Sequence, residues 1–171
     1  MTSEGRRRVL GIDPGTATTG FGIVEEDGGQ LRAIASGVIR TRADQPTPER
    51  LQTIHRRLKA LAAEWQPAEA AVEELFFSSN VRTAMRVGQA RGVAILALAD
   101  AGLKVAEYTP LAIKQAVTGY GSADKAQVQE MVKMLLRMDE VPRPDDAADA
   151  LAVAICHLHS ARLRELSKLA Q

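Results

Sequence analysis

Four acidic residues lie in three separate segments of the chain, each beside or within an apolar run. Asp13 directly follows one such run, and Glu73 interrupts another, at residues 69–75. Asp146 and Asp149 are three residues apart at the start of a predicted helix, so they share one face of it. Carboxylate oxygens are hard ligands that suit Mg²⁺ or Mn²⁺, with water or substrate phosphate completing the shell. Together the four acids predict a divalent-metal site if the fold brings them close.

Each of these acids also has an ordinary structural explanation. An aspartate such as Asp13 in a turn often hydrogen-bonds backbone N–H groups, and Asp145 or Asp146 can cap a helix. Glu73 or Glu74 can be a charge on an edge strand. Each explanation alone is at least as common as a catalytic role, and only the occurrence of all four acids in one mixed sheet favours the metal site. Residue spacing leaves the choice within each adjacent pair open.

The elements that must position these acids are predicted from the spacing of apolar residues. Asp27-Gly28-Gly29, between two apolar runs, is a strong hairpin signal. Strands are expected at residues 8–12, 21–25, 31–40, 69–75 and 103–108. Three helices are expected at residues 48–65, 80–101 and 110–117. A fourth is expected to begin at 122 or 123 and to include the apolar positions up to 136, and a fifth to run from after 144 to about 166.

The order of these elements, βββαβαβααα, predicts an α/β fold. A hairpin leads into strands joined by helical crossovers, so the five-stranded sheet should be mixed, with helices on both faces. The first strand would lie centrally, and ligands would bind where strand ends and helix starts converge. No repeat or long linker divides the chain, so residues 1–171 are expected to form a single domain, with 1–7 and about 164–171 as flexible tails.

Composition and charge bound the class of protein. Of 171 residues, 46% are hydrophobic and 25% charged, which is typical of a folded globular protein and not of a disordered or collagen-like chain. No apolar run is longer than 93–99, which is too short to cross a bilayer, and no secretory apolar segment follows the first basic residues. We therefore expect a cytoplasmic protein without membrane contact. Cys156 is the only cysteine, which excludes a disulfide framework and a cysteine-based zinc site.

Six motifs resemble those of the RuvC-type Holliday junction resolvases, in the same order and at similar spacing from about Val9 to about His159. Two departures are visible: Ala126 stands where the family commonly has Ser, and Leu75 where it has Gln or a similar residue. Neither touches a metal-binding acid. The motifs are Gly11-Ile12-Asp13-Pro14-Gly15, Thr19-Gly20-Phe21-Gly22, Val72-Glu73-Glu74-Leu75-Phe76, Gly88-Gln89-Ala90-Arg91-Gly92-Val93-Ala94, Gly119-Tyr120-Gly121-Ser122-Ala123-Asp124-Lys125 and Asp146-Ala147-Ala148-Asp149-Ala150-Leu151-Ala152.

The resemblance implies a ribonuclease H-like fold and a homodimer that cuts four-way DNA junctions by paired nicks, in recombination and DNA repair. It also implies that Asp13, Glu73, Asp146 and Asp149 are the metal-binding acids, which resolves both ambiguous pairs. Phosphodiester hydrolysis needs a nucleophilic water and a stabilised leaving oxygen, and two Mg²⁺ or Mn²⁺ ions about 4 Å apart can supply both. In the family the products are 5′-phosphate and 3′-hydroxyl ends, and the usual partner is the RuvA–RuvB branch-migration complex.

The charge balance of the chain fits a nucleic-acid substrate once the metal acids are set aside. The formal net charge is +1, but without the four acids 22 basic residues face 17 acidic ones, a balance of +5. Lys114 and Lys125 match two basic positions beside the family's active site. Arg82 and Arg86 fit DNA contact and solvated surface charge equally well.

Two aromatic residues follow the strand that carries Glu73. An exposed aromatic side chain beside a phosphodiester site can stack on an unpaired base, a contact worth about 1–3 kcal/mol. Phe76 matches the family's base-stacking position, and Phe77 is expected to pack inside the protein. Gly88 and Gly92 share one face of a helix, which indicates either close packing on the sheet or the dimer contact that the resemblance favours.

The histidines supply no metal-ligand spacing, so a structural role is expected for all three and for the cysteine; these residues are His55, His157, His159 and Cys156.

Three other functions are compatible with parts of the sequence. Residues 11–16 also resemble the first phosphate loop of sugar kinases and actin-like ATPases, but those folds need two such lobes, and a second Asp-x-Gly-Thr loop is absent. A YqgF-like RNA-processing nuclease would share the fold and similar acids, but the complete 146–149 signature and the longer chain favour a resolvase. A non-catalytic junction-binding protein would be expected to lack one of the four acids.

Overall fold

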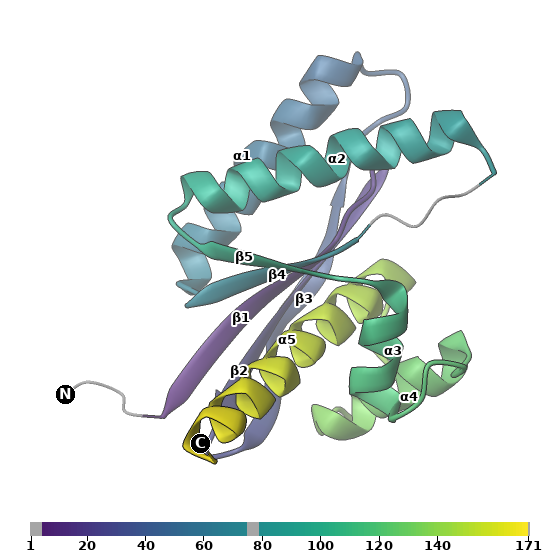
Figure 1. Ribbon diagram of the computed structural model, residues 1–171. Coiled ribbons are helices and arrows are strands. Elements are labelled where there is room, and N and C mark those ends of the chain that lie inside the picture. Colours follow the sequence, from purple (N-terminus) through teal and green to yellow (C-terminus); the bar gives the residue numbers. More distant parts are fainter. Residues whose placement is uncertain (1–4, 75–78, 171) are drawn as a thin grey trace.

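The computed structural model describes residues 5–74 and 79–170, and within them it forms one mixed sheet of five strands (Figure 1). The strands are β1 (Arg6–Asp13), β2 (Thr18–Asp27), β3 (Gln30–Arg40), β4 (Glu69–Glu73) and β5 (Lys104–Tyr108). They lie in the order β3-β2-β1-β4-β5. The first three form an antiparallel meander, while β1, β4 and β5 are parallel. The predicted mixed sheet with a central first strand is confirmed.

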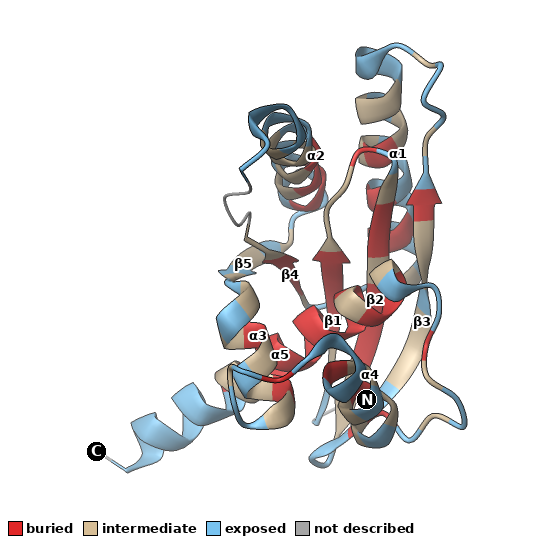
Figure 2. Cartoon of the chain, turned by 90° about the vertical axis from the view of Figure 1, so that its right-hand side faces the viewer, coloured by how far each residue is buried: buried red, intermediate tan, exposed pale blue. Residues whose placement is uncertain are grey.

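Helices cover both faces of this sheet (Figures 1 and 2). They are α1 (Thr47–Trp65), α2 (Val81–Asp100), α3 (Pro110–Thr118), α4 (Lys125–Leu135) and α5 (Asp145–Leu169). α1 and α2 pack on one face, and α5 crosses the other with α3 and α4 against it. The order of elements is the predicted one. No helix among the described residues is long and apolar enough to span a membrane.

Side-chain alternation along β1 explains why the sheet is covered on both faces. Leu10 and Ile12 point to the face of α1 and α2, whereas Val9 belongs to the core on the face of α5. All three side chains are fully buried. The two-sided burial follows from helices covering both faces of the sheet, and β1 is central because it pairs with β2 on one edge and β4 on the other.

Small residues allow α5 to lie unusually close to β1 and β2. A Cβ atom added at Gly11 would overlap the backbone of Ala150 and lie 2.7 Å from the amide nitrogen of Ala154. A Cβ added at Gly20 would overlap the carbonyl group of Asp146. This close approach places the first turns of α5 directly against the carboxyl end of β1 and the start of β2.

Several element ends differ from the sequence prediction for local reasons. α4 begins at Lys125 rather than near Ser122, because the Asp124 carboxylate accepts from the Gln127 amide and the Gln127 side chain accepts from the Asp124 amide. α5 continues to Leu169, so residues from 164 onward are helical up to that point. The described part of β4 ends at Glu73, and residues 75–78 lie outside the described residues.

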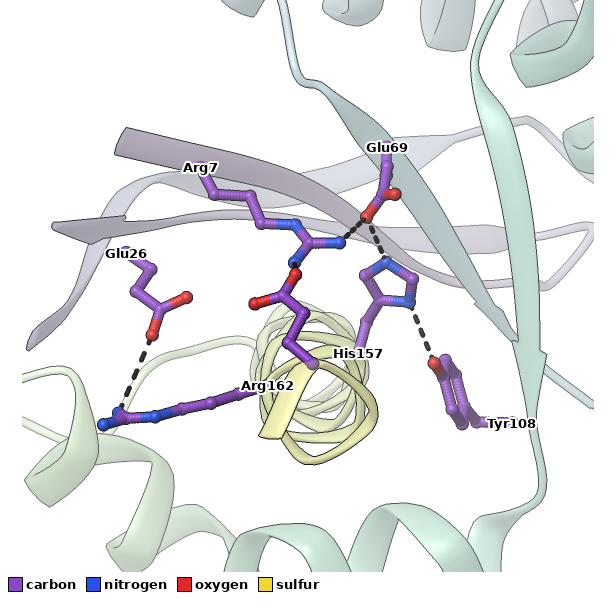
Figure 3. Close-up of polar contacts among 7 residues, drawn as sticks. Arg7, Glu26, Glu69, Tyr108, His157 and Arg162 are labelled. Atoms are coloured by element: carbon purple, nitrogen blue, oxygen red, sulfur yellow. Dashed lines mark hydrogen bonds and ion pairs between the residues drawn. The ribbon is translucent and has the colours of Figure 1, made fainter. Parts of the chain in front are cut away.

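A polar network ties α5 to β1, β4 and β5 (Figure 3). The buried His157 ring lies with Nε2 2.6 Å from the Glu69 carboxylate and Nδ1 2.9 Å from the Tyr108 hydroxyl. The Arg7 guanidinium donates to Glu69 at 2.7 Å and to Glu165 at 3.0 Å. Burial raises the pKa of Glu69, but the hydrogen bonds from His157 and Arg7 outweigh it and hold that pKa below its ordinary value. The expected structural role of His157 agrees with these contacts.

We expect Glu69→Gln to destabilise the fold by about 1–3 kcal/mol at neutral pH, because it removes a charged acceptor of two hydrogen bonds. A lowered pKa contributes stability above the unfolded value of 4.5, and that contribution is lost as pH falls through the lower folded value. The difference from the wild type should therefore shrink in urea titrations below about pH 4.5. Glu165→Gln is the matched control, since its exposed carboxylate shares Arg7 yet should contribute little. If wild type and Glu69→Gln differ as much in free energy of unfolding at acid pH as at neutral pH, the charged Glu69 carboxylate is not the source of the stabilisation.

Candidate active site

The four predicted acids are carried by three elements that meet at one edge of the sheet. Asp13 is the last residue of β1 and Glu73 the last of β4. Because β1 and β4 are parallel neighbours, their carboxyl ends lie side by side. Asp146 and Asp149 lie in the first turns of α5, where the helix begins after Pro144. Two strand ends and one helix start thus converge, as the sequence predicts.

The side chains of these acids lie within reach of one common ion. One carboxylate oxygen each from Asp13, Asp146 and Asp149 falls within 4.8 Å of the others. Glu73 joins the cluster through a side-chain hydrogen bond with Asp13. Asp145 instead is exposed and points to Lys125 and Gln129, with 3.1 Å between its carboxylate and the Gln129 amide. Geometry therefore distinguishes Asp146 from Asp145, which residue spacing does not.

The electrostatics of the cluster are those of crowded carboxylates with too little positive charge. Burial raises the pKa of Asp13 to about 9, and the neighbouring charges of Glu73 and Asp149 act in the same direction. Burial also raises the pKa values of Glu73 and Asp149, against the lowering effect of the nearby lysine ammonium groups. Without a cation, Asp13 therefore retains its proton near neutral pH.

Two lysines complete this side of the site. The Lys125 ammonium lies 3.6 Å from the Asp149 carboxylate and 3.3 Å from that of Asp145. Lys114, on α3, is half-buried and lowers the pKa of Glu73 through its charge. A cavity of about 250 Å³ opens between them; its lining comprises Glu73, Asp149, Lys114 and Lys125 with the apolar residues Pro110, Ile113, Val128 and Ala152.

The two arginines predicted to contact DNA lie on α2, on the opposite face of the sheet. Arg82 is in the first turn of α2 and exposed, and Arg86 follows one turn later. Arg86 lines a second cavity, of about 350 Å³, beside the connection between β1 and β2. Phe76 and Phe77 lie outside the described residues, so the base-stacking prediction stays a prediction.

Sequence reasoning missed one of the two basic residues that line this second cavity. Arg50, on α1, lines it together with Arg86. The sequence does not show that Arg50, rather than Arg56 or Arg57 on the same helix, lines this cavity. The three arginines differ in the side of the helix they occupy, and only the packing of the helix shows which side faces the cavity.

The cluster of acids fits a hard divalent cation. Every ligand atom offered by Asp13, Asp146 and Asp149 is a carboxylate oxygen, which is the donor type that Mg²⁺ and Mn²⁺ prefer. The raised pKa of Asp13 points the same way, since a cation placed among these carboxylates would replace the proton that Asp13 retains.

Comparison with known proteins places the chain in one family. The model of the family "Crossover junction endodeoxyribonuclease RuvC" matches residues 9–157. The chain belongs to the RuvC family. A RuvC from Chloroflexus aggregans is 62% identical over 154 residues, which cover 90% of this chain and 94% of that protein. A RuvC from Syntrophomonas wolfei is 56% identical over 156 residues and covers 91% of each chain.

Solved RuvC structures confirm the fold. Thermus thermophilus RuvC in complex with a Holliday junction substrate superimposes with a TM-score of 0.88 at 39% identity, covering 92% of this chain and 96% of that one. The yeast mitochondrial Holliday junction resolvase Ydc2 shares the fold, with a TM-score of 0.69 at 14% identity. The ribonuclease H-like α/β fold of the RuvC family, inferred from the motifs, is thus confirmed.

Proposed function

We propose that this chain is a structure-selective endonuclease that resolves four-way DNA junctions by paired symmetric nicks. The observation that carries the proposal is the convergence of four carboxylates from β1, β4 and α5 at one sheet edge, in a chain of the RuvC family. The similar Thermus thermophilus protein was solved with a Holliday junction substrate, which supports the same substrate here. Products with 5′-phosphate and 3′-hydroxyl ends, suited to ligation in recombination and DNA repair, complete the proposal.

The metal-binding residues of this proposal are Asp13, Glu73, Asp146 and Asp149, which would hold two Mg²⁺ or Mn²⁺ ions. Such ions, when bound, make water nucleophilic near neutral pH and stabilise the leaving oxygen. The protein holds the four carboxylates on two strand ends and one helix, so their positions are set before substrate arrives.

The lysines beside the acids orient the DNA backbone. Lys114 and Lys125 line the cavity next to Glu73 and Asp149, so their ammonium groups can bind phosphate oxygens that flank the cleaved bond. With the four acids set aside, the whole chain carries a surplus of five positive charges, which favours association with a polyanion. Phe76 remains the candidate for stacking on an unpaired base at the crossover.

A homodimer is proposed because symmetric cleavage of two strands requires two active sites. α2 offers a surface for it: Val81, Met85 and Leu96 are 69%, 64% and 55% exposed on one side of the helix. Gly92 lies on the same side with open space around its Cα, so it does not serve packing on the sheet. This exposed apolar stripe supports a dimer contact, rather than packing on the sheet, as the role of Gly88 and Gly92. The RuvA–RuvB complex stays an expected partner.

We expect Leu96→Glu to weaken dimerisation at least about tenfold, because a charge would be buried in the apolar contact. Light scattering after size-exclusion chromatography over a concentration series measures it. Leu163→Glu, at a residue that is 66% exposed on α5, is the matched control and should leave the dimer intact. Equal dimerisation of both variants would move the interface away from α2.

The activity is tested with a sequence-varied synthetic four-way junction, a linear duplex and a structured RNA, each with Mg²⁺, with Mn²⁺ or with EDTA. Paired, ligatable nicks near the crossover, seen only with metal and absent from the duplex, are the expected result. Junction binding without cleavage under either metal would favour a non-catalytic junction-binding protein. Cleavage of RNA without preference for the junction would favour the YqgF-like function.

A further inference from the structure

The second cavity lies at the same end of the sheet as the acids but on the face that carries α1 and α2, where β1 points into the space between these helices (Figure 2). It measures about 350 Å³. Among the described residues no acidic side chain lines it, whereas Glu73 and Asp149 line the first cavity. Its polar lining residues are Thr16, Thr18, Thr83, Arg50 and Arg86.

Hydrogen bonds join the walls of this cavity into one unit. The Arg50 Nε donates to the Thr41 hydroxyl at 2.8 Å, and that hydroxyl donates to the Thr16 carbonyl at 2.6 Å. The buried Thr16 hydroxyl in turn donates to the Arg86 carbonyl at 2.9 Å. α1, α2 and the loop after β1 are thus connected through side chains, and the Arg50 guanidinium is held by its Nε.

The terminal nitrogens of both arginines remain available for a ligand. Among the residues that the structure describes, neither Arg50 nor Arg86 forms an ion pair with a carboxylate. Two guanidinium groups with threonine hydroxyls and no carboxylate form a donor-rich site, and such sites suit a phosphate group.

The position of the cavity places its occupant near the proposed cleavage site. Thr16 follows Asp13 by only three residues, so an occupant lies at the same sheet edge as the cleaved bond. Lys114 and Lys125 flank the acids from the other face of the sheet. A DNA backbone that crosses the acids therefore meets basic side chains on both sides.

We propose that this cavity, with Arg50 as its previously unassigned cation, binds a DNA backbone phosphate other than the cleaved one. The inference rests on the proposed function and deepens it, because it adds a second anchoring point that fixes where the backbone crosses Asp13. Arg50 contacts the phosphate, and Thr41 is a positioning residue that orients the Arg50 side chain.

Binding to a four-way junction and to a duplex, measured without divalent ions over a range of salt concentrations, tests the site. Arg50→Gln should weaken junction binding about tenfold and reduce the slope of log affinity against log salt by about 0.9, the value for one lost phosphate contact. Arg32→Gln is the matched control, because Arg32 is an exposed arginine near the opposite end of the sheet. It should change neither quantity. Equal affinity and slope for the two variants would overturn the proposal.

Junctions with single methylphosphonate groups then locate the phosphate. One neutralised position near the crossover should weaken binding of the wild type but not of Arg50→Gln, since the variant has already lost that contact. If the cavity instead binds a free anion, no neutralised phosphate will weaken binding of the wild type more than binding of the variant. This result also overturns the proposal. If the wild type binds junction and duplex equally well but Arg50→Gln still lowers the slope of log affinity against log salt, the proposed junction specificity is refuted. The phosphate site itself is then supported. Absence of DNA binding refutes both.

Discussion

Replacing Asp13 by Asn is expected to reduce junction cleavage at least about 1,000-fold, because it removes a carboxylate that we propose holds the metal ions that stabilise the transition state. Asp13 lies at the centre of the cluster, hydrogen-bonded to Glu73 and near the oxygens of Asp146 and Asp149. Asn keeps the size of the side chain and one acceptor oxygen but not the charge. Junction binding should persist. Single-turnover cleavage in Mg²⁺ and in Mn²⁺, with binding measured in parallel, provides the comparison.

The same variant should be more stable than the wild type when no divalent ion is present. The pKa of Asp13 is raised from 3.8 to about 9, so the unfolded chain loses this proton well before the folded protein does. Wild-type stability therefore declines as pH rises from about 4 to about 9, and Asp13→Asn escapes that decline. Asp27→Asn, at a half-buried aspartate of the far hairpin that pairs with Arg6, is the control and should cleave normally. A variant that is both inactive and less stable would indicate a folding defect instead.

Gly20→Ala is expected to lower the free energy of unfolding by about 3 kcal/mol or more, a decrease in Tm of about 6–12 °C. The added Cβ would overlap the backbone carbonyl of Asp146, which cannot move without moving α5. The helix would then shift away from β2 and carry Asp146 and Asp149 away from Asp13. Cleavage should fall with stability, even at temperatures where the variant remains folded.

Gly37→Ala separates this effect from a general intolerance of alanine in the sheet. Its Cβ would meet the ring of Phe21 at 3.0 Å, and a ring edge can shift where a backbone carbonyl cannot. We expect a loss of about 1 kcal/mol or less and unchanged cleavage. Thermal unfolding followed by circular dichroism ranks the two variants. Equal losses would show that the approach of α5 to β2 is not the limiting contact.

The sequence by itself determined the elements and the chemical type of the site. Alternating apolar residues and the Asp27-Gly28-Gly29 turn predicted the hairpin, and the spacing of the leucines on α1 predicted that helix almost to the residue. These signals are local, since they depend on side-chain period and turn geometry within a few residues. The motifs around Asp13 and Asp146 added the family, which the comparisons confirmed.

Only the tertiary structure decided which side chains meet. Asp13 and Asp146 are 133 positions apart, and their approach depends on the glycines of β1 and β2 that allow α5 to lie against the strands. Lys125 comes near Asp149 because α4 packs beside α5, and Arg50 joins Arg86 because α1 and α2 share one face of the sheet. Such contacts depend on how whole elements pack, which no local pattern encodes. The physical reason is that a side chain's partners are set by the helix or strand face it occupies and by what covers that face.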